Sequence, residues 1–222
     1  MAILLNIDTA VETASVCLSD NTEVLRLAIN EKQKDHAAWL HMAITDILKN
    51  AGLAITDLDA VAISIGPGSY TGLRIGLATA KGLCYALKIP LISINTLKMM
   101  AGAVKTENNE LICPLIDARR MEVFTAIYNN SLEEVIKPFA MIVVKDSFAD
   151  LLTFHKIIFC GNGSKKLQTV LSHTNAIFDG SIATAADLPH LSYPCFLEKK
   201  FADLAYIEPL YLKEFYSATH TF

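Results

Sequence analysis

The stretches LLNIDTAVETASVCLSDN, residues 4–21, and CPLIDARRMEVFTAIYNN, residues 113–130, follow the same pattern. In each of them an apolar run ends in an acidic residue, Asp8 in the first and Asp117 in the second, and an alternating run then leads to a polar turn. This pattern predicts a β-strand followed by a hairpin. Because the unit occurs twice, the sequence predicts two related lobes that face one another.

The same periodicity predicts the remaining elements of both lobes. In the first lobe the predicted strands are 2–8, 13–19, 22–29, 59–65 and 91–94, and the predicted helices are 35–50, 71–87 and one from Thr96. In the second lobe the predicted strands are 111–117, 122–128, one from Glu133 and 156–160, with a helix from Lys165. The polarity rises at 107–110, so we divide the chain into lobes 1–106 and 107–222 and expect the last segment to pack back on the first lobe.

This duplicated plan resembles that of the actin, Hsp70 and sugar-kinase superfamily. The resemblance implies an α/β fold of two actin-like lobes, each built on a mixed sheet of the ribonuclease H type. It also implies that the acid at the end of each first strand, Asp8 or Asp117, points into the cleft between the lobes.

The composition is that of a globular protein, because 52% of the 222 residues are hydrophobic and 19% are charged. The net charge of −4 lacks the basic excess of a free-standing nucleic-acid binder, so any RNA would be gripped mostly by another subunit. The five scattered cysteines form no CxxC pair, which argues against a disulfide framework or a zinc knuckle. The N-terminus lacks the pattern of a signal peptide and no apolar run reaches the roughly 18 residues of a membrane span, so we expect a cytoplasmic protein without membrane contact.

The run GPGSYTG, residues 66–72, joins a predicted buried strand to a long helix. Gly66 and Gly68 permit a positive φ or a close backbone approach, and Ser69 or Thr71 is placed to cap the helix where an anion is also favoured. A phosphate-binding loop and a tight structural turn are both open, and the residues favour the turn because the ending of a Walker loop is absent.

A second glycine turn, with Gly161 and Gly163, follows the strand predicted at 156–160. The start of a helix is a common place for a backbone-lined anion or nucleotide site. Glycine turns between a strand and a helix also occur for steric reasons alone, so this turn leaves both interpretations open.

Two predicted helices carry apolar residues on their outer faces as well as on their core faces. On the helix at 71–87 the outer residues are Ile75, Ala78, Gly82 and Ala86, and on the helix at 35–50 they are Trp39 and Met42. A helix that is apolar all round is buried on both sides, so we predict a protein–protein interface on this pair. The alternative is that the helices pack on each other or under the second lobe.

Six motifs occur in a fixed order over nearly the whole chain: LNIDTAVETASVCL, KDHAAWL, GPGSYTGLRIGLATAKGLCYAL, ISINTLKMMA, PLIDARRMEVFTAIY and IEPLYLK. Together they resemble the TsaB (YeaZ) family, the paralogues of the TsaD/Kae1 enzymes. The resemblance implies a non-catalytic subunit of the complex that moves a threonylcarbamoyl group from its adenylate to N6 of the adenosine beside the anticodon of tRNA. It implies pairing with a TsaD-like enzyme through the first-lobe helices, a TsaE-like ATPase in the assembly and indirect contact with tRNA. The apolar outer faces of these helices would also allow a homodimer when the chain is alone.

The catalytic paralogue carries a His-x-x-x-His metal pair, and the corresponding positions here are Thr96 and Met100. A hydroxyl and a thioether do not replace two imidazoles as ligands. His36 and His41 are five residues apart on a helix and therefore do not share a face. We expect no catalytic residue, no metal and no intrinsic cofactor, with nucleotide bound only at a junction of the complex.

Two alternatives are open. The first is an ATP-dependent phosphotransferase or ATPase of the actin-like superfamily that uses Asp8 and Asp117 around Mg²⁺. Neither acid is followed by the glycine of a phosphate turn, and Arg119 would occupy a phosphate position. The second is a metallopeptidase, which needs a metal site that the sequence does not offer.

Overall fold

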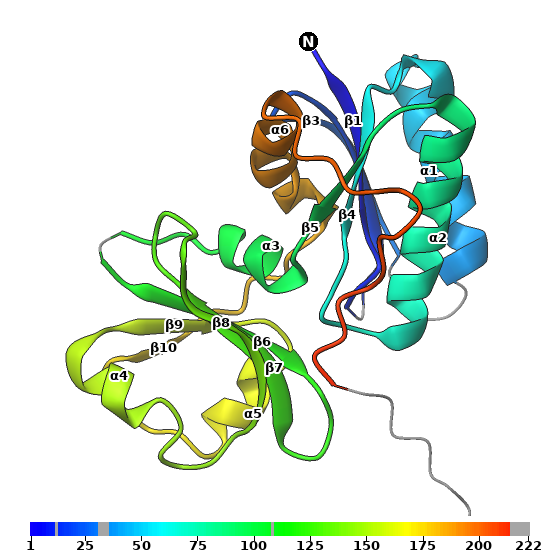
Figure 1. Cartoon of the computed structure of the whole chain (residues 1–222). Coiled ribbons are helices and arrows are strands. Elements are labelled where there is room, and N and C mark those ends of the chain that lie inside the picture. The colour runs from blue at the N-terminus through cyan, green and yellow to red at the C-terminus, as the bar shows by residue number, and fades with distance from the viewer. Residues whose placement is uncertain (12, 31–35, 108, 214–222) are drawn as a thin grey trace, which may run out of the picture.

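The computed structural model describes residues 1–11, 13–30, 36–107 and 109–213 and consists of two lobes, each built on a five-stranded mixed sheet (Figure 1). The first lobe contains β1 (Ile3–Asp8), β2 (Ser15–Asp20), β3 (Glu23–Ile29), α1 (His36–Ala51), η1 (Ile55–Asp57), β4 (Ala60–Ser64), α2 (Tyr70–Leu87), β5 (Leu91–Ile94) and α3 (Thr96–Gly102). The elements that follow are β6 (Leu111–Asp117), β7 (Glu122–Tyr128), β8 (Glu134–Ile142), α4 (Ala149–Phe154), β9 (Ile157–Cys160), α5 (Ser164–Gln168), β10 (Ala176–Phe178), η2 (Ala185–Asp187) and α6 (Pro189–Leu197). Among the described residues no helix is long and apolar enough to cross a membrane.

The two sheets repeat one topology. The first has the order β3-β2-β1-β4-β5 and the second the order β10-β9-β6-β7-β8. β1 pairs antiparallel with β2 and parallel with β4, and β6 pairs in the same two ways with β7 and β9. The predicted duplication and the two-lobed α/β fold are therefore confirmed.

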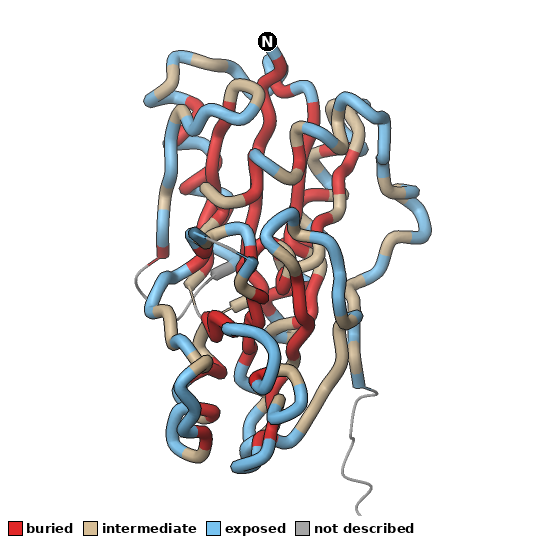
Figure 2. Tube along the Cα trace, turned by 90° about the vertical axis from the view of Figure 1, so that its left-hand side faces the viewer, coloured by how far each residue is buried: buried red, intermediate tan, exposed pale blue. Residues whose placement is uncertain are grey.

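The helices α1 and α2 cover one face of the first sheet (Figure 1). Their apolar stripes meet the inward side chains of β1 and β4 in one cluster, which includes Leu40, Ile44 and Leu77 opposite Leu5 and Ile63. Side chains of this helical spacing fall on one face of a helix, which is why these segments pack there. Figure 2 shows that buried residues follow the strands of both lobes.

The opposite face of the first sheet belongs to a core that both lobes share. Leu4 and Ile92 of that face join Leu97 of α3 and Ile116 and Ile158 of the second sheet in a single buried cluster. The helix α3 lies between the two sheets in Figure 1. The lobes are therefore joined by continuous apolar packing, which disfavours free movement between them.

After β10 the chain returns to the first lobe. The backbone N–H of Ala185 in η2 donates to Ser15 Oγ at 2.8 Å, and α6 packs on β1 and β5. The segment 198–213, orange to red in Figure 1, then runs along the first lobe, where Ala202 N–H donates to the Leu91 carbonyl at 2.8 Å and Leu210 N–H to the Ile65 carbonyl at 2.7 Å. The first lobe is therefore formed by the elements β1 to α3 together with the chain from η2 onward.

Candidate functional site

The glycine run at the start of α2 lies in direct contact with the turn that follows β1. Ser69 N–H donates to the Ala10 carbonyl at 2.6 Å, and a Cβ added at Gly68 would lie 2.2 Å from that oxygen. A Cβ at Gly72 would lie 2.0 Å from the Thr9 carbonyl oxygen. These distances are too short for any side chain, so glycine is required for the close approach of two backbones.

This contact decides between the two interpretations of the run. Thr9 and Ala10 lie where side chains at Gly72 and Gly68 would be, and Thr9 Oγ1 donates to the Gly72 carbonyl at 2.8 Å, so the contact alone accounts for these glycines. Ser69 caps α2 by accepting from Gly72 N–H at 3.3 Å, while Thr71 is exposed. The geometry supports a structural turn.

Asp8 lies inside the first lobe and not in the cleft. It is fully buried, and its Oδ1 accepts from Ala10 N–H at 3.0 Å and from the Ser64 hydroxyl. Its Oδ2 has no hydrogen-bond partner in the described part of the chain. Burial raises the pKa of Asp8 to about 6, against the opposing effect of the two hydrogen bonds. The expectation that Asp8 points into the cleft is wrong, because β4 and the turn after β1 enclose it.

Asp117, the equivalent acid of the second lobe, is exposed and paired. Its carboxylate accepts from Lys166 Nζ and from Arg119 N–H, both at 2.6 Å, and its own N–H donates to Asn162 Oδ1 at 2.9 Å. Partial burial acts to raise the pKa of Asp117, but the hydrogen bonds and positive charges of Lys166 and Arg119 outweigh it and hold this pKa below its usual value. One acid is buried and the other is held by a lysine, so the two do not form a common Mg²⁺ site.

The second glycine turn packs against α3 and against β6 of its own lobe. Gly161 has φ +84°, and a Cβ there would lie 2.1 Å from Met100 Cε and 2.6 Å from the Leu115 carbonyl oxygen. Gly163 lies against Leu115 and Ile116 in the same way. Close packing on β6 accounts for both glycines.

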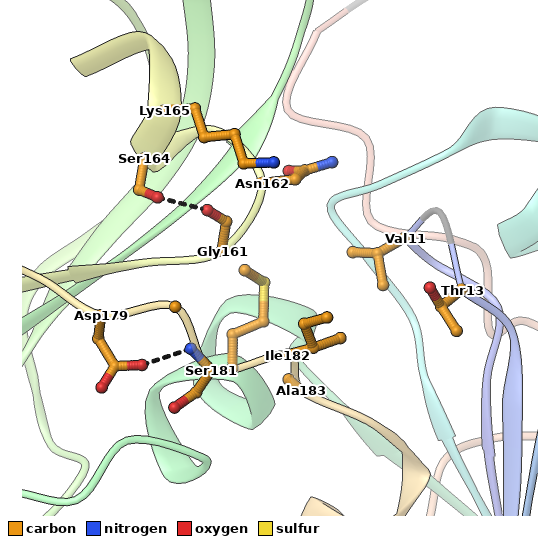
Figure 3. A pocket seen from close by; sticks show the side chains of 12 residues that line it. Val11, Thr13, Gly161, Asn162, Ser164, Lys165, Asp179, Ser181, Ile182 and Ala183 are labelled. Carbon is orange, nitrogen blue, oxygen red and sulfur yellow. Dashed lines mark hydrogen bonds between the residues drawn. The ribbon is translucent and has the colours of Figure 1, made fainter. Parts of the chain in front are cut away.

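A cavity of about 230 Å³ lies between the lobes beside this turn (Figure 3). Asn162 and Lys165 of the second lobe face Val11 and Thr13 of the first across it, and Met100 and Ile182 supply apolar walls. Asp8 and Asp117 do not line the cavity. It therefore lacks the paired acids that the ATPase alternative requires.

The positions that carry the metal pair in the catalytic paralogue have other roles here. Thr96 is fully buried and its Oγ1 accepts from Gly66 N–H at 2.9 Å, while Met100 is buried in the core that both lobes share. Over the described ranges no three metal-ligating side chains come together. His36 begins α1, and its side chain lies outside the description.

The predicted interface residues divide into two groups. Met42 is 65% exposed, and Ala78, Gly82 and Ala86 are exposed along one side of α2, with open space around the Cα of Gly82. Trp39 and Ile75 are only partly exposed and pack against the first-lobe core, so their placement on the outer face is wrong. Sequence reasoning missed Tyr85, which is 81% exposed next to Ala86. We call Met42, Ala78, Gly82, Tyr85 and Ala86 the outer face.

One flank of α2 is covered by the C-terminal segment. Lys81 Nζ donates to the Ile207 carbonyl at 3.3 Å, and Arg74 Nε donates to the Tyr211 hydroxyl at 3.2 Å. The Arg74 guanidinium lies 4.1 Å from the centroid of the Tyr70 ring, which in turn packs on the ring of Tyr211. The motifs GPGSYTGLRIG and IEPLYLK, which are 137 residues apart at Arg74 and Tyr211, thus meet in space.

The sequence matches known proteins over most of its length. The family model of TsaD, described as tRNA N6-adenosine threonylcarbamoyltransferase, matches residues 27–206. The tRNA threonylcarbamoyladenosine biosynthesis protein TsaB of Bacillus subtilis is 32% identical over 216 residues, with 95% of this chain and 93% of that protein covered. The chain belongs to the TsaB family.

Two further relatives are similar to this chain over nearly its whole length. The protein of the same name from Escherichia coli is 30% identical over 223 residues, with 95% of this chain and 94% of that protein covered. The solved structure of YeaZ from Pseudomonas aeruginosa superposes with a TM-score of 0.81 at 26% identity and covers 96% of this chain and all of that one. The TsaB match therefore includes both lobes and the returning C-terminal segment.

Proposed function

We propose that this chain is a non-catalytic subunit required for threonylcarbamoylation of N6 of the adenosine beside the anticodon in tRNAs. It acts by pairing with a TsaD-like enzyme and activating it. The names of its relatives supply the reaction. The observation that carries the subunit role is the outer face of α1 and α2, which is apolar and solvent-exposed.

The shape of the outer face suits a helix of a partner. Ala78, Gly82 and Ala86 recur at a spacing of four on one side of α2, so a second helix can approach the backbone closely there. Met42 of α1 and Tyr85 of α2 are exposed and offer large side chains for burial. A TsaD-like partner shares the family model that matches residues 27–206 and so has helices equivalent to α1 and α2.

The state of the acids supports the proposal that the lone chain does not catalyse the reaction. Asp8 is enclosed, Asp117 is paired with Lys166, and among the described residues that line the cavity between the lobes Asp179 is the one carboxylate. In this proposal the chemistry belongs to the TsaD-like enzyme, a TsaE-like ATPase completes the assembly, and nucleotide binds only where the subunits meet. The outer face also allows the chain to form a homodimer when it is alone.

Reconstitution tests the proposal. The purified chain is expected to modify no tRNA when supplied with threonylcarbamoyl-adenylate, and to support modification when TsaD and TsaE proteins are added. Gly82→Arg is expected to abolish co-purification with the TsaD-like protein while the melting curve stays cooperative. Gly180→Arg is the matched control, because it adds the same side chain at an open position of the second lobe. Modification by the lone chain, or normal pairing of folded Gly82→Arg, contradicts the proposal.

A further inference from the structure

The turn between β6 and β7 holds two of the chain's four arginines, Arg119 and Arg120. The other two arginines form hydrogen bonds elsewhere. Arg26 donates to the carbonyls of Leu25 and Asn50, and Arg74 donates to the Tyr211 hydroxyl. Arg119 and Arg120 are both exposed, and within the described residues neither guanidinium makes a hydrogen bond or an ion pair. The turn therefore presents two adjacent arginine side chains to solvent.

The backbone of this turn is held in an unfavourable conformation. Arg119, Arg120 and Met121 have φ values of 68°, 44° and 58°, which form one left-handed turn closed by Glu122 N–H donating to the Arg119 carbonyl at 2.8 Å. Residues with a Cβ avoid this region, and it persists only where surrounding bonds enforce it. Here the Asp117 carboxylate holds Arg119 N–H, and Val143 N–H donates to the Met121 carbonyl at 2.8 Å. The backbone that carries the two arginines is thus held in one conformation by these hydrogen bonds.

Positively charged side chains outnumber carboxylates at this turn. Its two carboxylates are already neutralised, because Lys166 pairs with Asp117 and Lys213 pairs with Glu122. Among the described residues neither Arg119 nor Arg120 forms an ion pair, although the charge of Arg119 helps to lower the pKa of Asp117. Lys165 adds a further positive charge beside Asn162 (Figure 3), whose Oδ1 accepts from Asp117 N–H. A chain with a net charge of −4 therefore carries a local positive patch here.

We propose that Arg119 and Arg120 bind backbone phosphates of the RNA on which the complex acts, an inference that rests on the proposed function. A guanidinium fork matches a phosphate in two parallel hydrogen bonds, and contacts of this kind position nucleic acid without reading its sequence. The phosphates of a nucleotide in the cleft are a poorer fit, because Arg119 and Arg120 do not line the cavity between the lobes. The small size of the patch makes it one positioning contact, with the partner enzyme supplying the rest.

The test is tRNA binding by the reconstituted complex of this chain with its TsaD-like partner, measured by fluorescence anisotropy over a series of KCl concentrations. The double variant Arg119→Gln with Arg120→Gln is expected to weaken binding roughly tenfold and to lower the slope of log affinity against log salt by about 1 to 2. Arg26→Gln, which removes an exposed arginine from β3, is the matched control and is expected to leave affinity and slope unchanged. Arg119→Lys with Arg120→Lys is expected to retain the salt slope and lose part of the affinity.

Two outcomes overturn the proposal. Unchanged tRNA affinity and slope in the glutamine variant show that the patch does not touch RNA. Loss of the protein complex itself, seen by size-exclusion chromatography before RNA is added, shows that the patch binds an acidic protein surface. If the wild-type chain does not pair with the TsaD-like protein, the proposed function fails. The isolated chain at low salt then tests the patch separately, by crosslinking to tRNA in the wild type and the glutamine variant.

Discussion

The carbonyl oxygen of Ala10 occupies the space that a side chain at Gly68 would need, at 2.2 Å from the ideal Cβ position. The oxygen cannot retreat, because it accepts a hydrogen bond from Ser69 N–H at 2.6 Å. The most recognisable motif of the chain is therefore explained by contact between the two turns that end β1 and β4. That contact also fixes where α2 starts, and with it the outer face.

Replacing Gly68 with alanine is expected to lower the free energy of unfolding by more than about 3 kcal/mol, because backbone would have to move on both sides of the contact. Gly82→Ala is the matched control. Its new methyl group meets nothing within 4 Å, and alanine in the interior of a helix should stabilise by roughly 0.5 to 1 kcal/mol. Urea unfolding of the two variants measures the difference. Equal effects would mean that the turns are not in the contact described.

Asp8→Asn is expected to stabilise the protein at neutral pH. Burial raises the pKa of Asp8 from 3.8 to about 6, so between these values the folded protein keeps a proton that the unfolded chain has lost. Stability from this group is therefore highest below pH 3.8, falls as the pH rises to 6, and stays constant above it, a change of roughly 3 kcal/mol. Asparagine carries no charge to bury and removes this dependence.

The measurement for Asp8 is the difference between the unfolding free energies of wild type and variant at a series of pH values. Taking the difference cancels the titrating groups that do not interact with Asp8. Asp187 does interact with it, because its negative charge contributes to the raised pKa of Asp8. Threonylcarbamoylation by the reconstituted complex should be unchanged in the variant. A loss of activity with an intact fold would return Asp8 to the catalytic role that the ATPase alternative gave it.

Most of the fold could be predicted from the sequence, because its elements carry clear periodicity and end at glycine or polar turns. The returning helix α6 escaped prediction for a physical reason: its sequence PHLSYPCFL is apolar on all sides and contains Pro194 inside the helix. No single stripe marks its buried face, so only the contact with β1 and β5 shows what it packs against.

The site was harder to predict than the fold, because its key partners are distant in sequence. Asp8 accepts a hydrogen bond from the hydroxyl of Ser64 in β4, 56 residues away, and the sequence near Asp8 does not indicate that the carboxylate is enclosed. Trp39 and Ile75 appeared to lie on an outer face because helical spacing shows direction only, and not how far a core extends around a helix. The C-terminal residues Leu204 and Ile207 widen that core, which only the folded chain reveals.

Tyr211 is expected to anchor the C-terminal segment to α2 through its ring more than through its hydroxyl. Tyr211→Phe keeps the packing on Tyr70, at 5.5 Å between ring centroids, and loses only the bond from the exposed Arg74. Tyr211→Ala loses both, so limited proteolysis should cut the segment 198–213 several times faster in the alanine variant while the phenylalanine variant resembles wild type. Equal cleavage of all three proteins would show that the backbone bonds of Ala202 and Leu210 suffice to hold the segment.

Arg120→Gly separates a structural from a functional reason for the arginine turn. Glycine accepts the φ of 44° without strain, so the variant is expected to gain roughly 1 kcal/mol in unfolding free energy although it loses a charged side chain. Arg26→Gly is the control, because glycine inside the β3 strand should destabilise by a similar amount.

The same Arg120→Gly protein should bind tRNA more weakly when it is paired with the TsaD-like enzyme. A variant that is more stable but binds RNA more weakly would show that Arg120 lowers the stability of the turn and contributes to RNA binding. A less stable variant with normal RNA binding would show that the side chain serves the fold.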